Sequence, residues 1–301
     1  MGRVADLATE LFDYLGATAG QAAWQVTAAG ASGRGSVSQL QLRSQVWRGM
    51  AWDHRMSVAR PGSPAVDDVA ILVVGGDPAP EDAQFALQLA RQAGLPVAVL
   101  SNVPVQPLLG LREDALIAHT FARYLAEGDP DWPLLFPMTR AASAAMDAAA
   151  GAAADLWGVN LRGFVVTGAS KLAWTTYLAA AAAPDRVLGI VPMAFDILDI
   201  LPQIAHQVEV WGEPSPMIHD YLERGLIEAF AHTPRGARLG WFVDPYSYRC
   251  AYTMPKLVVR GANDPYWPVD ALRVSGRASP TPSGPSWCPT AATPWGDDPR
   301  R

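Results

Sequence analysis

The spacing of apolar residues changes along this chain, and the change predicts the order of its elements. Over residues 22–59 apolar and polar residues alternate in pieces, notably at 37–47 and 51–58, with glycine-containing turns between them. Alternation with a period of two predicts antiparallel strands, as a pair or a meander. After residue 68, short apolar runs separated by helical stretches replace the alternation. That order predicts an α/β fold with a doubly wound, mostly parallel sheet.

Strands and helices are expected to alternate through most of the chain. We expect strands at 69–74, 96–100, 164–167, 186–193 and 256–260, and helices at 1–16, 81–93, 113–126, 138–156 and 171–183, with a loop at 129–137. Residues 199–245 interrupt the alternation, and about 199–247 is expected to form a cap inserted over the carboxyl edge of the sheet. One domain is therefore predicted over residues 1–274.

The last 27 residues differ from the rest. Residues 275–301 hold six Pro, three Gly, four Ser and three Thr, and no Leu, Ile, Val or Phe. Such a composition cannot build a core, so a disordered tail is predicted there.

Composition narrows the range of functions. The net charge is −6, with 23 basic and 29 acidic residues and no strong basic run, so nothing points to nucleic acid. The two cysteines, Cys250 and Cys288, have neither disulfide-framework nor zinc spacing, and we predict no metal and no cofactor. Asp6, Glu10 and Asp13 interrupt any apolar core of a secretory signal, and no stretch is suited to span a bilayer. A cytoplasmic location is expected for the chain as given, with export as the alternative for its relatives. The sequence predicts neither a particular substrate nor an oligomeric state.

A serine lies where a strand is predicted to turn into a helix. Ser170 follows the apolar run 164–167 and precedes the alanine-rich stretch 171–183. A sharp turn there lifts a hydroxyl above the sheet, and the N–H of Lys171 at the start of the helix suits an oxyanion. Ser170 is therefore a candidate nucleophile. The alternative is a helix N-cap.

Further candidates follow other predicted strands. Gly75 and Gly76 follow the strand at 69–74, where a second oxyanion donor belongs; the alternative is a plain turn. Asp264 follows 256–260 and is the candidate acid, with a turn residue before Pro265 as the alternative. Asp196 is the alternative acid, unless it caps a helix.

Several longer sequence motifs surround these candidate residues. They are GASKLAW, PMAFDIL, SPMIHDYLERGL, DPYSYR, MPKLVVRGANDPYWPVDAL, EDALIAHTFARYL and DWPLLFPM, which lie between residues 113 and 272, within a similarity that covers about residues 37–272. This set resembles the PhoPQ-activated pathogenicity-related family, which is similar to α/β-hydrolases. The resemblance implies that Ser170 is the nucleophile, that Asp264 is the acid, and that Gly75, Gly76 and Lys171 form the oxyanion region.

The sequence departs from the pattern of that family in two places. Ala173 replaces a glycine of the elbow, and no histidine follows Asp264. The resemblance implies that the last strand and helix are missing, as after a frameshift or truncation. An ester or amide hydrolase without its base is expected to be inactive, unless His206 or His232 swings in. The alternative is a non-catalytic binding or signalling protein on the same scaffold, linked to pathogenicity.

Two more expectations concern the surroundings of the site. Lys171 is expected to bind an anionic substrate group, to pair with a carboxylate of the cap, or to be solvated. Among the aromatic residues near the cap, Tyr266 and Trp267 are candidates to contact substrate. A missing last strand would expose the edge at 256–260, so low solubility or marginal stability is expected.

Overall fold

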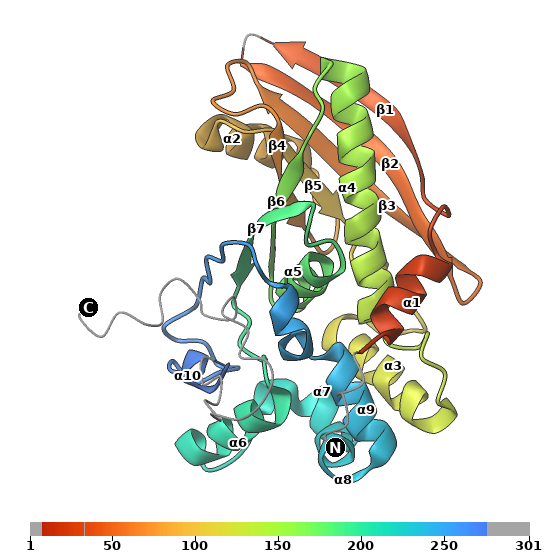
Figure 1. The fold of residues 1–301 in the computed structure, drawn as a ribbon, viewed down its shortest axis with the longest axis vertical. Helices are drawn as coiled ribbons and strands as arrows, with labels where there is room; N and C mark the ends of the chain where they lie inside the picture. The colour runs from red at the N-terminus through yellow and green to blue at the C-terminus, as the bar shows by residue number, and fades with distance from the viewer. Residues whose placement is uncertain (1–7, 33, 276–301) are drawn as a thin grey trace, which may run out of the picture.

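The computed structural model describes residues 8–32 and 34–275, which are built around one seven-stranded sheet of order β1-β2-β3-β5-β4-β6-β7 (Figure 1). The strands are β1 (Ala23–Ser32), β2 (Gly35–Trp47), β3 (Met50–Pro61), β4 (Val69–Val74), β5 (Val97–Ser101), β6 (Gly163–Ala169) and β7 (Val187–Met193). The first three are antiparallel, and β5, β4, β6 and β7 are parallel to one another. The predicted α/β fold with a mostly parallel sheet is confirmed.

Helices cover both faces of the sheet. The long helix α4 (Leu135–Trp157) lies across one face, and α2 (Asp82–Ala93) lies on the other (Figure 1). In β4 the side chains alternate between the two layers: Leu72 belongs to the large core on the α4 side, and Ile71 packs with the small cluster under α2. A strand buried on both faces reads as a continuous apolar run, which explains the pattern of residues 69–74.

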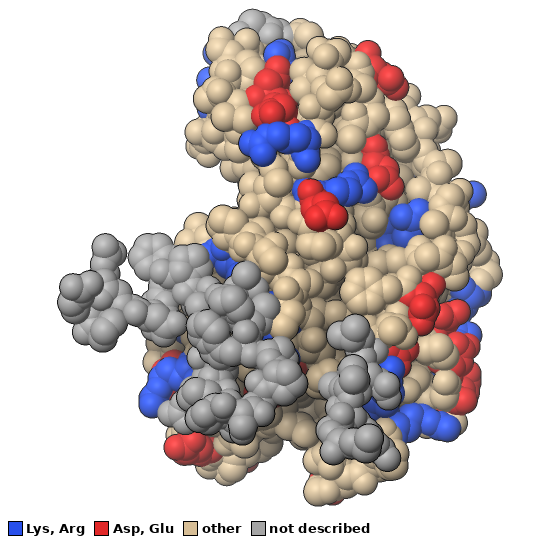
Figure 2. Space-filling model, in the orientation of Figure 1, with Lys and Arg blue, Asp and Glu red and all other residues tan. Residues whose placement is uncertain are grey.

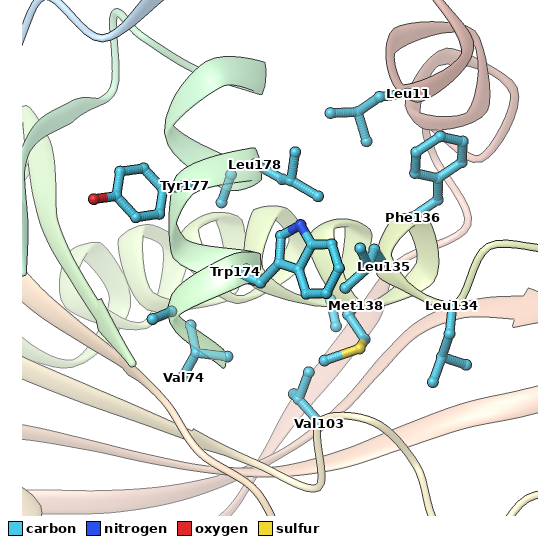
Figure 3. Packing of buried hydrophobic residues seen from close by; sticks show 14 of the residues in the cluster. Leu11, Val74, Val103, Leu134, Leu135, Phe136, Met138, Trp174, Tyr177 and Leu178 are labelled. Atoms are coloured by element: carbon cyan, nitrogen blue, oxygen red, sulfur yellow. The ribbon is translucent and has the colours of Figure 1, made fainter. Parts of the chain in front are cut away.

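The helix α5 (Lys171–Ala182) packs beside α4 and carries part of the core. Figure 3 shows its Trp174 among the apolar side chains of this core, near Met138 of α4 and Leu178 of its own helix. The indole nitrogen of Trp174 donates to the carbonyl of Val243, 2.6 Å away. This contact fixes α5, and with it the start of the helix at Lys171, against the C-terminal helices.

Two helix boundaries differ from the sequence prediction. α4 begins at Leu135, inside the stretch expected to be a loop, because Pro137 lies in the first turn, where a missing N–H costs no helical hydrogen bond. α1 covers Glu10–Ala17, and residues 1–7 of the expected helix lie outside the described residues. The helix α3 covers Glu113–Glu127, close to its predicted range.

Residues 200–251 form short helices at the lower end of the molecule as drawn in Figure 1. They are α6 (Ile200–Trp211), η1 (Pro216–Ile218), α7 (His219–Leu222), α8 (Leu226–His232), α9 (Pro234–Val243) and η2 (Pro245–Ala251). Asp244 joins the start of α6 to the start of η2, because its carboxylate accepts hydrogen bonds from the N–H groups of Ile200 and Tyr246 at 2.9 and 2.8 Å.

The strand expected at 256–260 is not a regular one. This segment runs parallel to β7 through single bridges, Ile190 with Lys256 and Met193 with Val259. Among the described residues, no strand pairs with its outer side, and Leu257 and Val259 are 50% and 42% exposed. The chain then reaches α10 (Leu272–Ser275), and residues 276–301 of the expected disordered tail lie outside the described residues.

Charges on the surface are mixed. Figure 2 shows acidic and basic side chains next to one another at several places on this face. On the described surface as a whole, salt bridges such as Arg162 with Asp68 and Arg186 with Asp147 join side chains of opposite charge. No helix in the described part of the chain is both long and apolar enough to cross a bilayer.

Candidate active site

Ser170 lies between β6 and α5 in a backbone conformation that residues with a side chain rarely adopt. Its φ and ψ are 56° and −128°, and its side chain makes no capping hydrogen bond. The alternative interpretation of Ser170 as a side-chain N-cap therefore has no support in the geometry. Strained backbone of this kind is concentrated at functional sites, where the surrounding structure holds it.

The bend at Ser170 depends on Gly168. A Cβ on Gly168 would lie 2.6 Å from the carbonyl oxygen of Leu172, so a side chain would push the first turn of α5 away from β6. The N–H of Ser170 donates to the carbonyl of Met193 at 2.9 Å, and this bond continues the pairing of β6 with β7. Strand and helix thus meet closely, as a nucleophile elbow requires.

The elbow lies at the point where the strand order reverses. From β4 the chain crosses through α2 to β5 on one side, and from β6 it crosses through α5 to β7 on the other. Ligands of open α/β sheets bind at the carboxyl ends of strands at such a point. Gly75 and Gly76 directly follow β4 at this edge, and Ser170 and Lys171 follow β6. Since Lys171 is the first residue of α5, its N–H has no carbonyl partner within the helix.

The acidic residues belong to the same edge. The N–H of Ala194 donates to the carbonyl of Val259 at 2.8 Å, so the ends of β7 and of the 256–260 segment are level with Ser170. Asp264 follows that segment, and its carboxylate accepts the N–H of Tyr266 at 2.7 Å. The topology therefore places Ser170 and Asp264 at one edge of the sheet.

Asp196 follows β7 and does not cap a helix. Its buried carboxylate accepts from Nε of Arg260 at 2.6 Å. Burial raises the pKa of Asp196; the guanidinium of Arg260 lowers it, and the carboxylate of Asp264 raises it further. A carboxylate already paired with an arginine has less capacity to orient an imidazole.

Three polar side chains of the region after β7 hold the loop that carries Asp264. Gln207 of α6 donates to the carbonyl of Tyr266 at 2.7 Å, and Gln203 donates to that of Ala271 at 3.0 Å. Ser215 donates to the carbonyl of Pro265 at 2.8 Å. Sequence analysis assigned no role to these residues, because isolated glutamines carry no pattern that predicts a distant backbone partner.

Next to Ser170 there is a cavity of about 40 Å³. Its lining includes Ser170, Lys171, Asp114, Tyr221, Tyr266 and Trp267. The structure thus brings the two aromatic residues expected to contact substrate to the candidate nucleophile. Asp114 and Tyr221 were missed as site residues, although both lie in quoted motifs, EDALIAHTFARYL and SPMIHDYLERGL. Asp264 and Gly76 are not among the residues lining this cavity.

The side chain of Lys171 is mostly buried, and its ammonium pairs with the carboxylate of Glu113. Burial lowers the pKa of Lys171, and the negative charge of Asp77 partly opposes that effect. A partner in the cap was one of the expectations for this lysine; the partner instead comes from the first residue of α3, which lies 58 positions earlier in the chain. The pair leaves little positive charge to attract an anionic substrate.

None of the five histidines lines this cavity in the described part of the chain. His206 is held by Asp270, with Nε2 at 2.7 Å from Oδ1, and the exposed side chain of His232 lies at the end of α8 beside Glu228. His54 is buried between Ser44 and the carbonyl of Asn102. His119 is on α3, and His219 bonds the carbonyl of Pro216. No cluster of three or more metal-ligating side chains occurs within the described residues.

The strain at Ser170 gives a testable result. Glycine tolerates a positive φ at no steric cost, whereas alanine does not. Ser170→Gly is therefore expected to have a free energy of unfolding about 1 kcal/mol higher than that of Ser170→Ala. Chemical denaturation measures both. As a control, Ala169→Gly in the regular strand next to it should be destabilising by about 0.5–1 kcal/mol; two variants of Ser170 with equal stability would argue against strain there.

A family model decides the membership of this chain. The model described as "PhoPQ-activated pathogenicity-related protein" matches residues 11–274. The chain belongs to the PhoPQ-activated pathogenicity-related family. The resemblance inferred from the motifs around Ser170 and Asp264 is thus confirmed.

Other comparisons place this family member among known proteins. It is 32% identical over 250 residues to autocrine proliferation repressor protein A of Dictyostelium discoideum. The aligned region covers 77% of this chain and 50% of that protein. The chain therefore spans about half the length of that relative. Among solved structures it is similar to acetyl xylan esterase 1 of a Thermoanaerobacterium species, with a TM-score of 0.59, 15% identity, and coverage of 89% of this chain and 82% of the esterase. A glucuronoyl esterase of Solibacter usitatus gives a TM-score of 0.53 at 13% identity, with 92% and 79% covered. At such identities these structures show the fold, that of α/β-hydrolase esterases.

Proposed function

We propose that this member of the PhoPQ-activated pathogenicity-related family carries a serine hydrolase site for an ester or amide, with Ser170 as its nucleophile. The observation that carries the proposal is the backbone of Ser170, held at a φ of 56° between β6 and α5. The confirmed hydrolase-like scaffold supports it, because this turn is where the scaffold presents its nucleophile.

The proposed chemistry assigns one role to each group. The hydroxyl of Ser170 attacks the carbonyl carbon, and the N–H groups of Lys171 and Gly76 hold the developing oxyanion. Asp264 supplies the carboxylate that orients an imidazole, with Asp196 as the alternative acid. Tyr266 and Trp267 contact the substrate in the cavity.

The imidazole is the group that this chain does not bring to Ser170. No histidine follows Asp264 in the sequence, and the five that precede it line no part of the cavity. A serine without a base is a weak nucleophile near neutral pH. Turnover by this chain is therefore proposed to be residual, about 10³–10⁴-fold over the reaction in water.

Chemical rescue tests this proposal. p-Nitrophenyl acetate hydrolysis is measured with and without added imidazole, for the wild-type chain and for Ser170→Ala. Added imidazole should raise the protein-dependent rate of the wild type, since it supplies the missing base, and should leave Ser170→Ala at the rate of imidazole alone. Equal rescue in both proteins would exclude Ser170 as the nucleophile.

A second candidate function is binding without catalysis. It is favoured by the cavity lining beside Ser170, which contains no histidine among residues 8–32 and 34–275, and by the name of the Dictyostelium relative, a repressor of proliferation. On this alternative the scaffold and cavity are retained for recognition, in binding or signalling linked to pathogenicity. This alternative would be supported if a folded chain showed no imidazole-dependent reaction at Ser170.

A further inference from the structure

The cavity beside Ser170 has an uneven distribution of charge. Lys171 and Asp114 both line it, but the ammonium of Lys171 is paired with Glu113, which lies outside the lining. Asp114 has no salt bridge to a lysine, arginine or histidine among the described residues. The cavity therefore contains one carboxylate whose charge no cation in contact neutralises.

Asp114 is held in place by a buried neighbour. The hydroxyl of Tyr221 donates to its Oδ1 at 3.1 Å, and the ring of Tyr221 packs against Phe121 with centroids 6.3 Å apart. This hydrogen bond orients the carboxylate without removing its negative charge. Burial raises the pKa of Asp114, Asp220 raises it further, and the bond from Tyr221 and the nearby His219 lower it.

The remaining lining is apolar and aromatic. Trp174, Tyr221, Tyr266 and Trp267 line the cavity together with Asp114 and Ser170, and Ala194, Phe195, Ile197 and Ile218 complete the lining. The faces of Trp and Tyr attract cations, and this attraction adds to that of a carboxylate when water is partly excluded. An anionic or wholly apolar group would leave the carboxylate desolvated and unpaired, which is unfavourable.

The size of the cavity limits what can enter. A buried water needs about 10–15 Å³ of such space, so 40 Å³ admits a group of only a few non-hydrogen atoms. A space of this size favours a small cationic group, such as a primary ammonium, over a bulky one.

We propose that the cavity binds a primary ammonium group of the substrate, paired with Asp114 and placed next to the carbonyl group that Ser170 attacks. The substrate class is then an ester or amide with an amino group close to its carbonyl, and one intervening carbon is the shortest such spacing. This inference rests on the proposed hydrolase site, because that site defines which carbonyl group lies next to the ammonium. The binding of the ammonium itself does not require the reaction.

Two amides of the same shape test the proposal. Glycinamide carries an ammonium group where propionamide carries a methyl group, and neither needs to react. Dissociation constants are measured by ligand-observed NMR on the full chain at a pH slightly below neutrality, with Ser170→Ala tested in parallel. Glycinamide should bind about tenfold more tightly than propionamide, as one ion pair with aromatic support predicts.

Variants assign the preference to Asp114. In Asp114→Asn, which keeps the shape and an acceptor for Tyr221, the two amides should bind within about twofold of each other. Tyr221→Phe keeps the carboxylate and should retain the preference. Equal binding of the two amides to the wild type, or an unchanged preference in Asp114→Asn, would overturn the proposal. A preference for glycinamide in a chain that shows no imidazole-dependent hydrolysis of p-nitrophenyl acetate at Ser170 would instead overturn the hydrolase and leave the ammonium site, so the two failures are distinguishable.

Discussion

Replacing Gly168 with alanine is expected to lower the free energy of unfolding by about 2–3 kcal/mol, the range of an overpacked core position. The new Cβ would lie 2.6 Å from the carbonyl oxygen and 2.8 Å from the carbonyl carbon of Leu172. Both are backbone atoms of the first turn of α5, so the clash cannot be relieved by rotating a side chain. Denaturation in guanidinium chloride measures the loss.

Gly189 provides the matched control for this prediction. It lies in β7, next to β6, and a Cβ there would meet its nearest atom, the carbonyl oxygen of Pro255, at an ordinary 3.6 Å. Gly189→Ala should change the stability by no more than about 0.5 kcal/mol. If Gly168→Ala were equally mild, the close contact between β6 and α5 that defines the elbow would be wrong.

Acid is expected to destabilise the fold through His54, by about 3 kcal/mol between pH 6.5 and pH 4. Burial lowers the pKa of His54 to about 4, from 6.5 in the unfolded chain. Between these values the unfolded chain binds a proton that the folded chain does not, so this contribution is fully present above pH 6.5 and is lost as the pH falls through 4. The ring nitrogens lie 2.9 Å from the hydroxyl of Ser44 and 3.0 Å from the carbonyl of Asn102, and it is burial of the ring that disfavours its charged form.

Stability measured against pH in two variants isolates this histidine. In His54→Gln the overall stability falls, but the part of the slope between pH 6.5 and pH 4 that His54 causes should disappear. His232 is exposed on α8, so His232→Gln should keep the slope of the wild type. An unchanged slope in His54→Gln would show that His54 titrates normally in the fold.

The sequence predicts those parts of the fold that depend on local patterns. The alternation over residues 22–59 corresponds to β1, β2 and β3, and the apolar run at 164–167 lies inside β6. The bend at Ser170 also has a local cause, since small residues are needed where a strand meets a helix. Its strained φ, however, arises from contacts of the whole β6–α5 unit, so the residue type at position 170 does not predict it.

Long-range partners were not predictable in the same way. The pairing of Lys171 with Glu113 joins two helices that are adjacent only in the folded chain. The hydrogen bond from Gln207 to the carbonyl of Tyr266 spans 59 positions and follows no sequence period. The segment 256–260 has the composition of a strand, but within the described ranges it joins the sheet through single bridges to β7, so it does not become a regular strand. Such outcomes are determined by which neighbours the tertiary fold supplies.

The exposed edge at 256–260 relates to the expectation of marginal stability. Leu257 and Val259 remain largely exposed there, together with Val269 at 68%. Apolar side chains beside an unpaired strand edge favour association with other chains. Low solubility of this chain stays a prediction, which a monodisperse monomer with a cooperative melt would contradict.

Peptide mapping after fluorophosphonate treatment measures the reactivity of Ser170 directly. The folded wild-type chain is treated in the presence of imidazole, digested and analysed by mass spectrometry, alongside Ser170→Ala. Ser170 should carry the phosphonyl group, and Ser170→Ala should show no labelled peptide in its place. A folded chain that stays unlabelled at Ser170, or that is labelled to the same extent after Ser170→Ala, would contradict a nucleophile at the turn between β6 and α5.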